Sequence, residues 1–150
     1  VIPGKMQSRK DLTEIMVSHH IPYVAQTLAV NNFKDLYEKS EKAIYTEGPA
    51  FLNVFSPCPR GWGYPTDDLM LINKLAMETC YWPMYEVING KYKINYKPKE
   101  KKPIEEFLRP QKRFKHMFKP GNEWMIEEFQ KEVDTRWQAL LDLEEITNKE

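Results

Sequence analysis

Residues 50–64 read Ala50-Phe51-Leu52-Asn53-Val54-Phe55-Ser56-Pro57-Cys58-Pro59-Arg60-Gly61-Trp62-Gly63-Tyr64. The first six form a nearly continuous apolar run of strand length, which is typical of a strand covered on both faces, as in a parallel sheet. The next segment is a restricted turn, because Pro57 and Pro59 fix the backbone on either side of Cys58 and the following glycines permit close approach. Open α/β sheets bind ligands just beyond the carboxyl ends of their strands. The stretch therefore predicts a buried strand followed by a ligand-binding turn.

Helical and strand-like patterns alternate on both sides of this run. Asp11 and Glu14 resemble a capping box that opens one helix, and Gly48-Pro49 ends a later one. Five side chains of that later helix share one face at helical spacing, namely Phe33, Leu36, Tyr37, Ser40 and Ile44. The alternation predicts an α/β layer structure, a parallel sheet flanked by helices with right-handed crossovers. The expected elements are, in chain order, a helix over 11–19, a strand over 21–29, a helix over 32–47, the strand over 50–55 and a helix over 66–79.

A hairpin and a charged stretch follow. Asn89-Gly90 predicts a tight turn between strands at 84–87 and 92–96, because both residues tolerate positive φ. The stretch 97–103 is rich in Lys and Pro. Its composition predicts a solvated surface linker; a nucleic-acid patch is the alternative.

The last part of the chain is one long helical pattern beginning near residue 122. Its apolar stripe either packs on its own domain or docks on a partner subunit, and we predict that the 123–150 helix contacts another chain. The chain is thus expected to comprise an α/β part over 1–88 and a hairpin end, linker and subunit-contacting helical tail over 89–150. The stripe consists of Ile126, Phe129, Val133, Trp137, Leu140 and Leu141.

Composition excludes several classes of protein. The 150 residues include 22 basic and 22 acidic side chains, and this zero net charge argues against general nucleic-acid or membrane binding. Two cysteines are too few for a disulfide framework and fit a reducing, cytoplasmic compartment. No apolar run approaches the roughly 20 residues that cross a bilayer. Because the chain starts at Val1 without a signal pattern, we interpret it as a fragment or a processed piece.

Cys58 is the candidate metal and cofactor ligand. A rigid turn that presents a thiolate beside backbone N–H groups suits an iron–sulfur cluster, whose potential depends on hydrogen bonds to sulfur. A lone cysteine at a strand end is also commonly a small buried apolar residue. One thiolate does not hold a four-iron cluster, so other ligands would have to come from elsewhere. The residues alone leave both interpretations open.

Several motifs in register resemble the β subunit of the pyruvate:ferredoxin oxidoreductases, within the 2-oxoacid:ferredoxin oxidoreductase family. The resemblance covers essentially the whole chain. The similar segments are Lys10-Asp11-Leu12, His20-Ile21-Pro22-Tyr23-Val24-Ala25, Gly48-Pro49-Ala50-Phe51, Ser56-Pro57-Cys58-Pro59, Gly61-Trp62, Ala76-Met77-Glu78-Thr79, Trp82-Pro83-Met84-Tyr85-Glu86, Gln111, Arg113-Phe114, His116, Gln130, Val133-Asp134 and Trp137.

This resemblance implies the C-terminal part of a thiamine-diphosphate-binding fold. It implies oxidative decarboxylation of pyruvate to acetyl-CoA, with coenzyme A as the acceptor of the acetyl group and electrons passing through [4Fe-4S] clusters to ferredoxin. Cys58 matches the family's fourth ligand to the nearby cluster. The family's motif for Mg²⁺ and thiamine diphosphate and its other three cysteine ligands lie outside these residues, so the missing N-terminal half or other subunits would supply them. Arg60 stands where the family commonly has Thr.

Two alternatives to the pyruvate enzyme remain. One is a sister enzyme acting on another 2-oxoacid or on oxalate. The other is a non-catalytic assembly module in which Cys58 is inert and the tail only binds a neighbour. No catalytic residue is assigned within this chain.

The remaining candidates have simpler interpretations. Cys80 is expected to be a buried thiol. His19 and His20 are adjacent, so they do not chelate as an i, i+4 pair would, and they more simply close a helix. His116 is interpreted as part of a basic surface or subunit contact, with a catalytic base as the alternative. The acidic residues of the last helix fall on its polar side, away from paired-carboxylate chemistry: Glu127, Glu128, Glu132 and Asp134.

Overall fold

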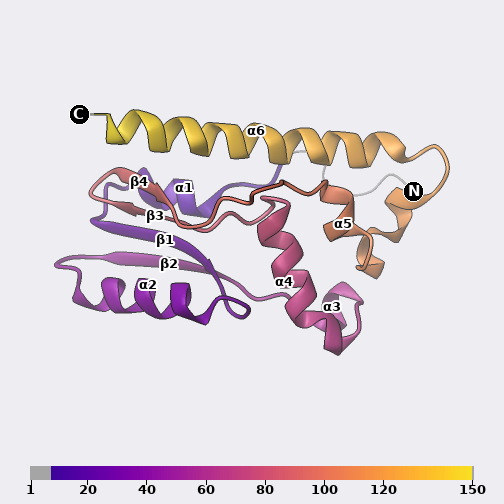
Figure 1. Ribbon diagram of the computed structural model, residues 1–150, viewed down its shortest axis with the longest axis horizontal. Coiled ribbons are helices and arrows are strands. Elements are labelled where there is room, and N and C mark those ends of the chain that lie inside the picture. Colours follow the sequence, from indigo (N-terminus) through magenta and orange to yellow (C-terminus); the bar gives the residue numbers. More distant parts are fainter. Residues whose placement is uncertain (1–7, 150) are drawn as a thin grey trace.

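The computed structural model describes residues 8–149 and has a four-stranded sheet at its centre (Figure 1). The strand order is β2-β1-β3-β4. β1 and β2 are parallel, whereas β3 runs antiparallel to β1 and β4 runs antiparallel to β3. The strands are β1 (Tyr23–Leu28), β2 (Ala50–Phe55), β3 (Tyr85–Ile88) and β4 (Lys91–Ile94).

The predicted parallel pairing is therefore found between β1 and β2, and the predicted hairpin pairs β3 with β4, but the pairing of β3 with β1 is antiparallel and makes the expectation of a parallel sheet wrong there. Asn89 and Gly90 adopt positive φ values of 48° and 81° and connect β3 to β4 as the predicted hairpin. A two-residue turn joins only antiparallel strands, because a parallel pair needs a long crossover. The hairpin adds to the free side of β1 and makes the sheet mixed.

The predicted helices are present, with additional short ones between them. Asp11 caps the first helix, and its Oδ1 accepts hydrogen bonds from the N–H groups of Thr13 and Glu14 at 3.1 and 3.2 Å. Glu14 does not complete a capping box; its carboxylate instead accepts hydrogen bonds from two tyrosines of the hairpin. The helices are α1 (Leu12–Val17), α2 (Phe33–Tyr45), α3 (Pro59–Trp62), η1 (Thr66–Asp68), α4 (Leu69–Glu78), α5 (Ile104–Leu108), η2 (Lys112–Phe118) and α6 (Glu123–Asn148).

Helices α1 and α2 cover opposite faces of the parallel pair. Thr13 of α1 donates a hydrogen bond to Gln26, whereas Thr27, the next residue of β1, donates to Asp35 of α2. Successive side chains of a strand point to opposite faces, so the two helices sandwich the pair. Figure 1 shows α2 and α6 on opposite sides of the molecule with the sheet between them.

β2 is less buried than its apolar run predicts. Val54 is 37% exposed and Ala50 is exposed, whereas Phe55 at the end of the strand is 6% exposed. The expectation of a strand covered on both faces is wrong for β2 within the described chain, because β2 lies at the edge of the sheet. β1, with a strand on each side, is buried along its whole length.

The stretch 97–103 lies on the surface, as predicted, but it is held by ion pairs. Lys97 lies 2.5 Å from Glu144 of α6, and Lys102 lies 3.1 Å from Glu78 of α4. The helix that follows was not predicted: α5 places three fully buried side chains in the core, Ile104, Phe107 and Leu108. These buried side chains anchor a segment whose Lys and Pro content suggested solvent alone.

The apolar stripe of α6 packs on its own chain. Val133 and Leu140 are buried, and the half-buried residues of the stripe contact the two apolar clusters of the core. The end of α6 also covers the outer edge of β4: Thr147 accepts a hydrogen bond from the N–H of Tyr92 at 3.0 Å, and Glu144 accepts one from the N–H of Ile94 at 2.6 Å. Within residues 8–149 no helix is both long and apolar enough to cross a membrane.

Candidate functional site

Cys58 lies at the start of α3, three residues after β2 ends, and its side chain is exposed. Its backbone is extended, with φ −93° and ψ 113°, and Pro59 is the first residue of the helix. Proline suits this position because its fixed φ is helical and its missing N–H has no partner there anyway. The predicted arrangement, a rigid turn that presents a thiol beyond the carboxyl end of a strand, is therefore found.

A backbone donor points at the sulfur. The N–H of Gly61 donates a hydrogen bond to Cys58 Sγ at 3.4 Å. A Cβ atom added at position 61 would lie 3.6 Å from the same sulfur, an ordinary van der Waals distance. Such N–H···S bonds stabilise a thiolate and tune the potential of a bound iron–sulfur cluster.

Tyr64 stabilises the backbone of the turn just before Cys58. This tyrosine is 5% exposed, and its hydroxyl donates a hydrogen bond to the carbonyl of Pro57 at 3.0 Å. Burial, and then the electrostatic influence of nearby Cys58, raise the pKa of Tyr64. The hydroxyl therefore stays protonated at neutral pH and remains a donor.

Residues of η2, about 50 positions further along the chain, also stabilise the turn that carries Cys58. The N–H of Lys112 donates a hydrogen bond to the carbonyl of Gly63 at 3.1 Å. The Arg113 guanidinium carbon lies 3.5 Å from the centre of the Trp62 ring, and its Nε donates to Gln111 Oε1 at 2.8 Å. Burial lowers the pKa of Arg113. A half-buried cation over an indole is a cation–π contact that holds Trp62, and with it α3, in place.

Sequence reasoning placed Gln111 and Arg113 in a motif but assigned them no role. Gln111 is 1% exposed. Its side-chain amide donates to the carbonyl of Phe107, and its oxygen accepts from Arg113. Local patterns do not reveal the contact with Trp62, because Trp62 lies about 50 residues earlier in the chain.

The other candidate residues do not gather at Cys58. Cys80 is 4% exposed, and burial raises its pKa to about 12, so the predicted buried thiol is confirmed. His19 and His20 are exposed in the turn after α1, and His116 is exposed in η2. The acidic residues named from α6 lie on its exposed or half-exposed side.

The described chain offers one cysteine ligand to a cluster. Within residues 8–149 no group of three or more His, Cys, Asp or Glu side chains is placed to hold a metal ion. The exposed thiol of Cys58 and the Gly61 N–H directed at it suit one ligand of a cluster, and the remaining ligands would come from other polypeptide.

Comparison with known proteins identifies the relatives of the chain. It is 45% identical over 147 residues to pyruvate synthase subunit PorB of Thermotoga maritima, which is 97% of this chain and 45% of that protein. The chain is homologous to the PorB and VorB subunits of 2-oxoacid oxidoreductases. PorB of Methanocaldococcus jannaschii is 42% identical over 93% of this chain and 45% of its own length. Ketoisovalerate oxidoreductase subunit VorB of Pyrococcus furiosus is 44% identical over 92% of this chain and 43% of its own length.

The resemblance inferred from the motifs is thereby confirmed at the level of the PorB and VorB subunits. No protein-family model matches the chain. The chain spans less than half the length of these relatives. The relatives named for pyruvate and those named for ketoisovalerate match this chain at about the same identity. The comparison therefore assigns the subunit family and does not distinguish between the two 2-oxoacids as substrate.

Proposed function

We propose that this chain is part of the β subunit of a pyruvate synthase, pyruvate:ferredoxin oxidoreductase, and forms the C-terminal part of its thiamine-diphosphate-binding fold. The reaction is the oxidative decarboxylation of pyruvate to acetyl-CoA, with transfer of electrons through [4Fe-4S] clusters to ferredoxin. Support comes from the identity to PorB subunits along nearly the whole chain. The parallel β1–α2–β2 unit is consistent with such a fold.

The role proposed for Cys58 is ligation of one iron of a [4Fe-4S] cluster. The observation that carries it is the exposed thiol beyond the end of β2, with the N–H of Gly61 directed at its sulfur. A cluster of this kind supplies one-electron transfer. The chain's own residues hold the thiolate: Gly61 donates to the sulfur, Tyr64 fixes the preceding backbone, and Arg113 packs over Trp62 behind the turn.

Thiamine diphosphate and Mg²⁺ are proposed to bind mainly to residues outside this chain, because their family motif is not in its sequence. The proposed partners are the other subunits or the N-terminal half of the β subunit, ferredoxin, and pyruvate and coenzyme A as substrates. No catalytic residue is proposed within the chain. Its proposed contribution is one cluster ligand, part of the sheet and the helical tail over 123–150, which we propose contacts another chain.

A second candidate substrate is 2-oxoisovalerate. The observation that favours it is the 44% identity to the ketoisovalerate oxidoreductase subunit VorB, close to the 45% identity to PorB. Steady-state assays of the purified holoenzyme with pyruvate and with 2-oxoisovalerate distinguish the two. A higher kcat/KM for pyruvate supports the first proposal, and a higher value for 2-oxoisovalerate supports the second.

Replacement of Cys58 tests the cluster proposal. We expect the anaerobically purified holoenzyme with Cys58→Ala to lose iron and the electron paramagnetic resonance signal of one cluster, while its circular dichroism is unchanged. Cys80→Ala is the matched control, because Cys80 is buried away from the turn, and this variant should keep its iron. Full iron content and an unchanged signal in Cys58→Ala would contradict the proposal and favour a non-catalytic assembly module.

A further inference from the structure

Arg113 carries a positive charge that no Asp or Glu side chain balances within residues 8–149. Its Nε donates a hydrogen bond to Gln111, but its Nη2 is buried and has no hydrogen-bond acceptor in this part of the chain. By contrast, the exposed Arg109 pairs with Glu105. A guanidinium stays protonated in proteins, so the charge at position 113 is permanent. It has lost part of its hydration without gaining a carboxylate partner, and a charge in that condition destabilises a fold unless another group compensates it.

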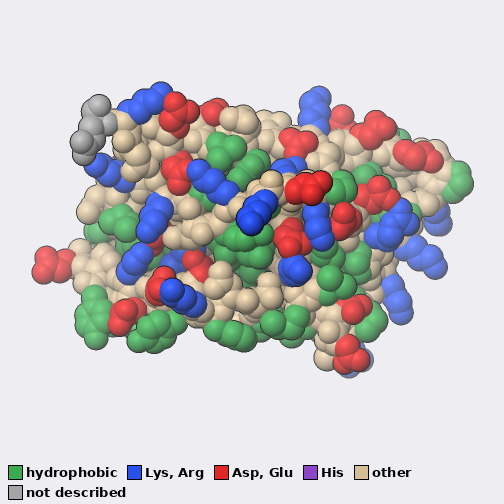
Figure 2. Space-filling view, in the orientation of Figure 1, with side chains coloured by type: hydrophobic (Ala, Val, Ile, Leu, Met, Phe, Trp, Pro, Cys, Tyr) green, Lys and Arg blue, Asp and Glu red, His purple; other side chains and the backbone are tan. Residues whose placement is uncertain are grey.

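Arg113 belongs to a basic stretch of the chain. Residues 107–122 contain five Lys and Arg side chains and no Asp or Glu. Figure 2 shows Lys and Arg side chains gathered at the end of the molecule where Figure 1 places the segment between α5 and α6. Water and salt screen exposed charges over a distance of about 10 Å, so most of this stretch acts weakly on distant groups. Arg113 is half-buried, whereas the other four are exposed: Arg109, Lys112, Lys115 and Lys119.

Two aromatic rings contact the guanidinium of Arg113. Its Cζ lies 3.5 Å from the centre of the Trp62 ring and 4.4 Å from the centre of the Phe114 ring. The rings displace water from the charge, and a charge that is screened by less water acts over a longer distance. These cation–π contacts explain how the guanidinium is held. They do not explain why it lacks a carboxylate, because an arginine that has an acidic partner can stack in the same way.

The ring under Arg113 stands next to Cys58. Trp62 donates its N–H to the carbonyl of Cys58 at 2.9 Å. Side chains four residues apart on a helical turn are neighbours, with their Cβ atoms about 5–6 Å apart. Tyr64 gives a second connection: burial raises its pKa, Cys58 raises it further and Arg113 lowers it, and its hydroxyl donates to the carbonyl of Pro57. One hydroxyl group therefore lies within electrostatic range of both the thiol and the guanidinium.

An anionic cluster at Cys58 would be the missing counter-charge. A [4Fe-4S] cluster held by four thiolates has a net negative charge, and reduction adds one electron to it. A fixed positive charge nearby favours the reduced form, and local charge and burial are among the properties that set a cluster's potential. At an effective dielectric constant of about 20, a unit charge on the order of 10 Å away shifts such an equilibrium by about tenfold. Arg113, stacked on the neighbour of Cys58, lies at this order of distance from it.

We propose that the Arg113 guanidinium raises the reduction potential of the [4Fe-4S] cluster that Cys58 ligates, through its charge and without touching the cluster. The inference rests on the proposed function, because it presupposes that cluster. It goes beyond the packing role of Arg113 behind the turn, since an uncharged side chain of similar length can cover Trp62 as well. Arg113 itself exchanges neither electrons nor protons.

A redox titration of the anaerobically purified holoenzyme, followed by electron paramagnetic resonance, tests this proposal. The signal to follow is the one that Cys58→Ala removes. Arg113→Met deletes the charge and keeps an apolar stem, so reduction of this cluster should become about tenfold less favourable, which lowers its potential by about 59 mV. Arg113→Lys retains the charge and should keep a potential near that of the parent enzyme. Arg109→Met is the matched control, because it removes an exposed charge that already pairs with Glu105, and it should leave the potential unchanged.

The outcomes separate a role in charge from a role in packing. Equal potentials in the parent enzyme and in Arg113→Met, at equal iron content, would overturn the inference. So would equal shifts in Arg113→Met and Arg113→Lys. Arg113→Gln is a second neutral variant, and loss of iron from both neutral variants would mean that Arg113 only holds the turn. Full iron in Cys58→Ala refutes the proposed function and this inference together, whereas loss of iron there with an unchanged potential in Arg113→Met refutes this inference alone.

Discussion

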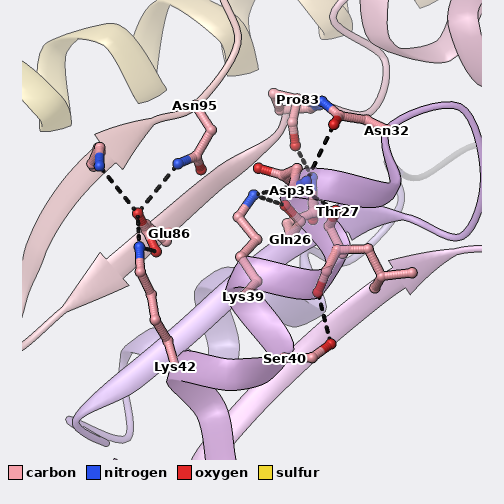
Figure 3. A network of polar contacts seen from close by, with 12 residues as sticks. Gln26, Thr27, Asn32, Asp35, Lys39, Ser40, Lys42, Pro83, Glu86 and Asn95 are labelled. Atoms are coloured by element: carbon pink, nitrogen blue, oxygen red, sulfur yellow. Dashed lines mark hydrogen bonds and ion pairs between the residues drawn. The ribbon is translucent and has the colours of Figure 1, made fainter.

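Lys39 Nζ lies 2.8 Å from Asp35 Oδ2, one turn earlier on α2, and both side chains are buried against the sheet (Figure 3). The ammonium group also donates to the carbonyl of Gln26 at 2.9 Å, and Asp35 accepts from the hydroxyl of Thr27. Burial is the main influence on Lys39 and lowers its pKa, while pairing with Asp35 opposes that change. A polar pair thus joins α2 to β1 where an apolar contact is usual.

The pair predicts a large effect for a single substitution. Lys39→Met should lower the free energy of unfolding by about 3 kcal/mol, because it leaves the Asp35 carboxylate buried without its cation. Urea denaturation at neutral pH measures the change. Lys34→Met is the matched control on the same helix, since Lys34 is 85% exposed and its ion pair with Glu38 should contribute less than about 0.5 kcal/mol. Equal effects of the two substitutions would contradict the prediction.

Glu86 predicts a loss of stability in acid. Burial alone would raise its pKa, but hydrogen bonds from Lys42 and Asn95, with the charge of Lys42, outweigh burial and lower it. A native pKa below the unfolded value means that the unfolded chain binds more protons, so the stability from Glu86 is present above the unfolded pKa and is lost as the pH falls through the native one. We expect the free energy of unfolding to fall between about pH 5 and pH 3.

The variant Glu86→Gln isolates this contribution. It should be less stable than the parent protein at pH 7 and should lose less stability on acidification. Urea denaturation at several pH values measures both. Glu145→Gln serves as the control, because Glu145 is 66% exposed on α6 and should leave the pH dependence unchanged. The same pH dependence in Glu86→Gln as in the parent would show that Glu86 is not responsible.

Much of the fold could be predicted because its elements are periodic and have clear ends. The turn at Asn89-Gly90, the cap at Asp11 and the apolar stripe of α6 are local signals, and the structure confirms each. Spacing shows which side chains share a face of a helix, but not which face meets the sheet. In α2 several large apolar side chains are exposed, whereas the side chains buried against the sheet are the paired Asp35 and Lys39. Likewise, an apolar run does not tell an edge strand from a central one, as β2 shows.

The candidate site, like the fold, could be predicted from the sequence only in part. The prolines around Cys58 and its position after a strand are readable in the sequence, so its placement could be predicted. The contact between Arg113 and Trp62 joins residues far apart in the chain, and it follows from the packing of η2 against α3. The short helix α5 was not predicted, because its buried residues are few and lie beside a Lys- and Pro-rich stretch.

Gly63 predicts a specific steric effect behind the cysteine turn. It has φ 71°, and a Cβ atom there would lie 2.8 Å from Cβ of Lys112, closer than real Cβ contacts allow. Gly63→Ala should lower the free energy of unfolding by about 1–3 kcal/mol through backbone strain. The close contact with Lys112 should lower it further. Gly121→Ala is the control: φ is 85° there, but within the described structure a Cβ would meet no atom within 4 Å. Thermal and urea unfolding of the two variants should differ, and equal losses would mean that η2 moves freely away from the turn.

The covered edge of β4 predicts a local change in amide exchange. Glu144 Oε1 accepts from the N–H of Ile94, and the pKa of Glu144 is lowered, because burial raises it less than Lys97 and this N–H together lower it. Glu144→Ala removes the acceptor, so the Ile94 amide should exchange about tenfold faster while amides of β1 are unchanged. Hydrogen exchange followed by mass spectrometry or NMR measures this difference. Glu145→Ala removes an adjacent carboxylate that pairs with Lys149 on the surface and should not affect Ile94. Faster exchange throughout the sheet would instead mean that α6 stabilises the whole fold through this residue, and unchanged exchange at Ile94 would mean that the edge is protected without it.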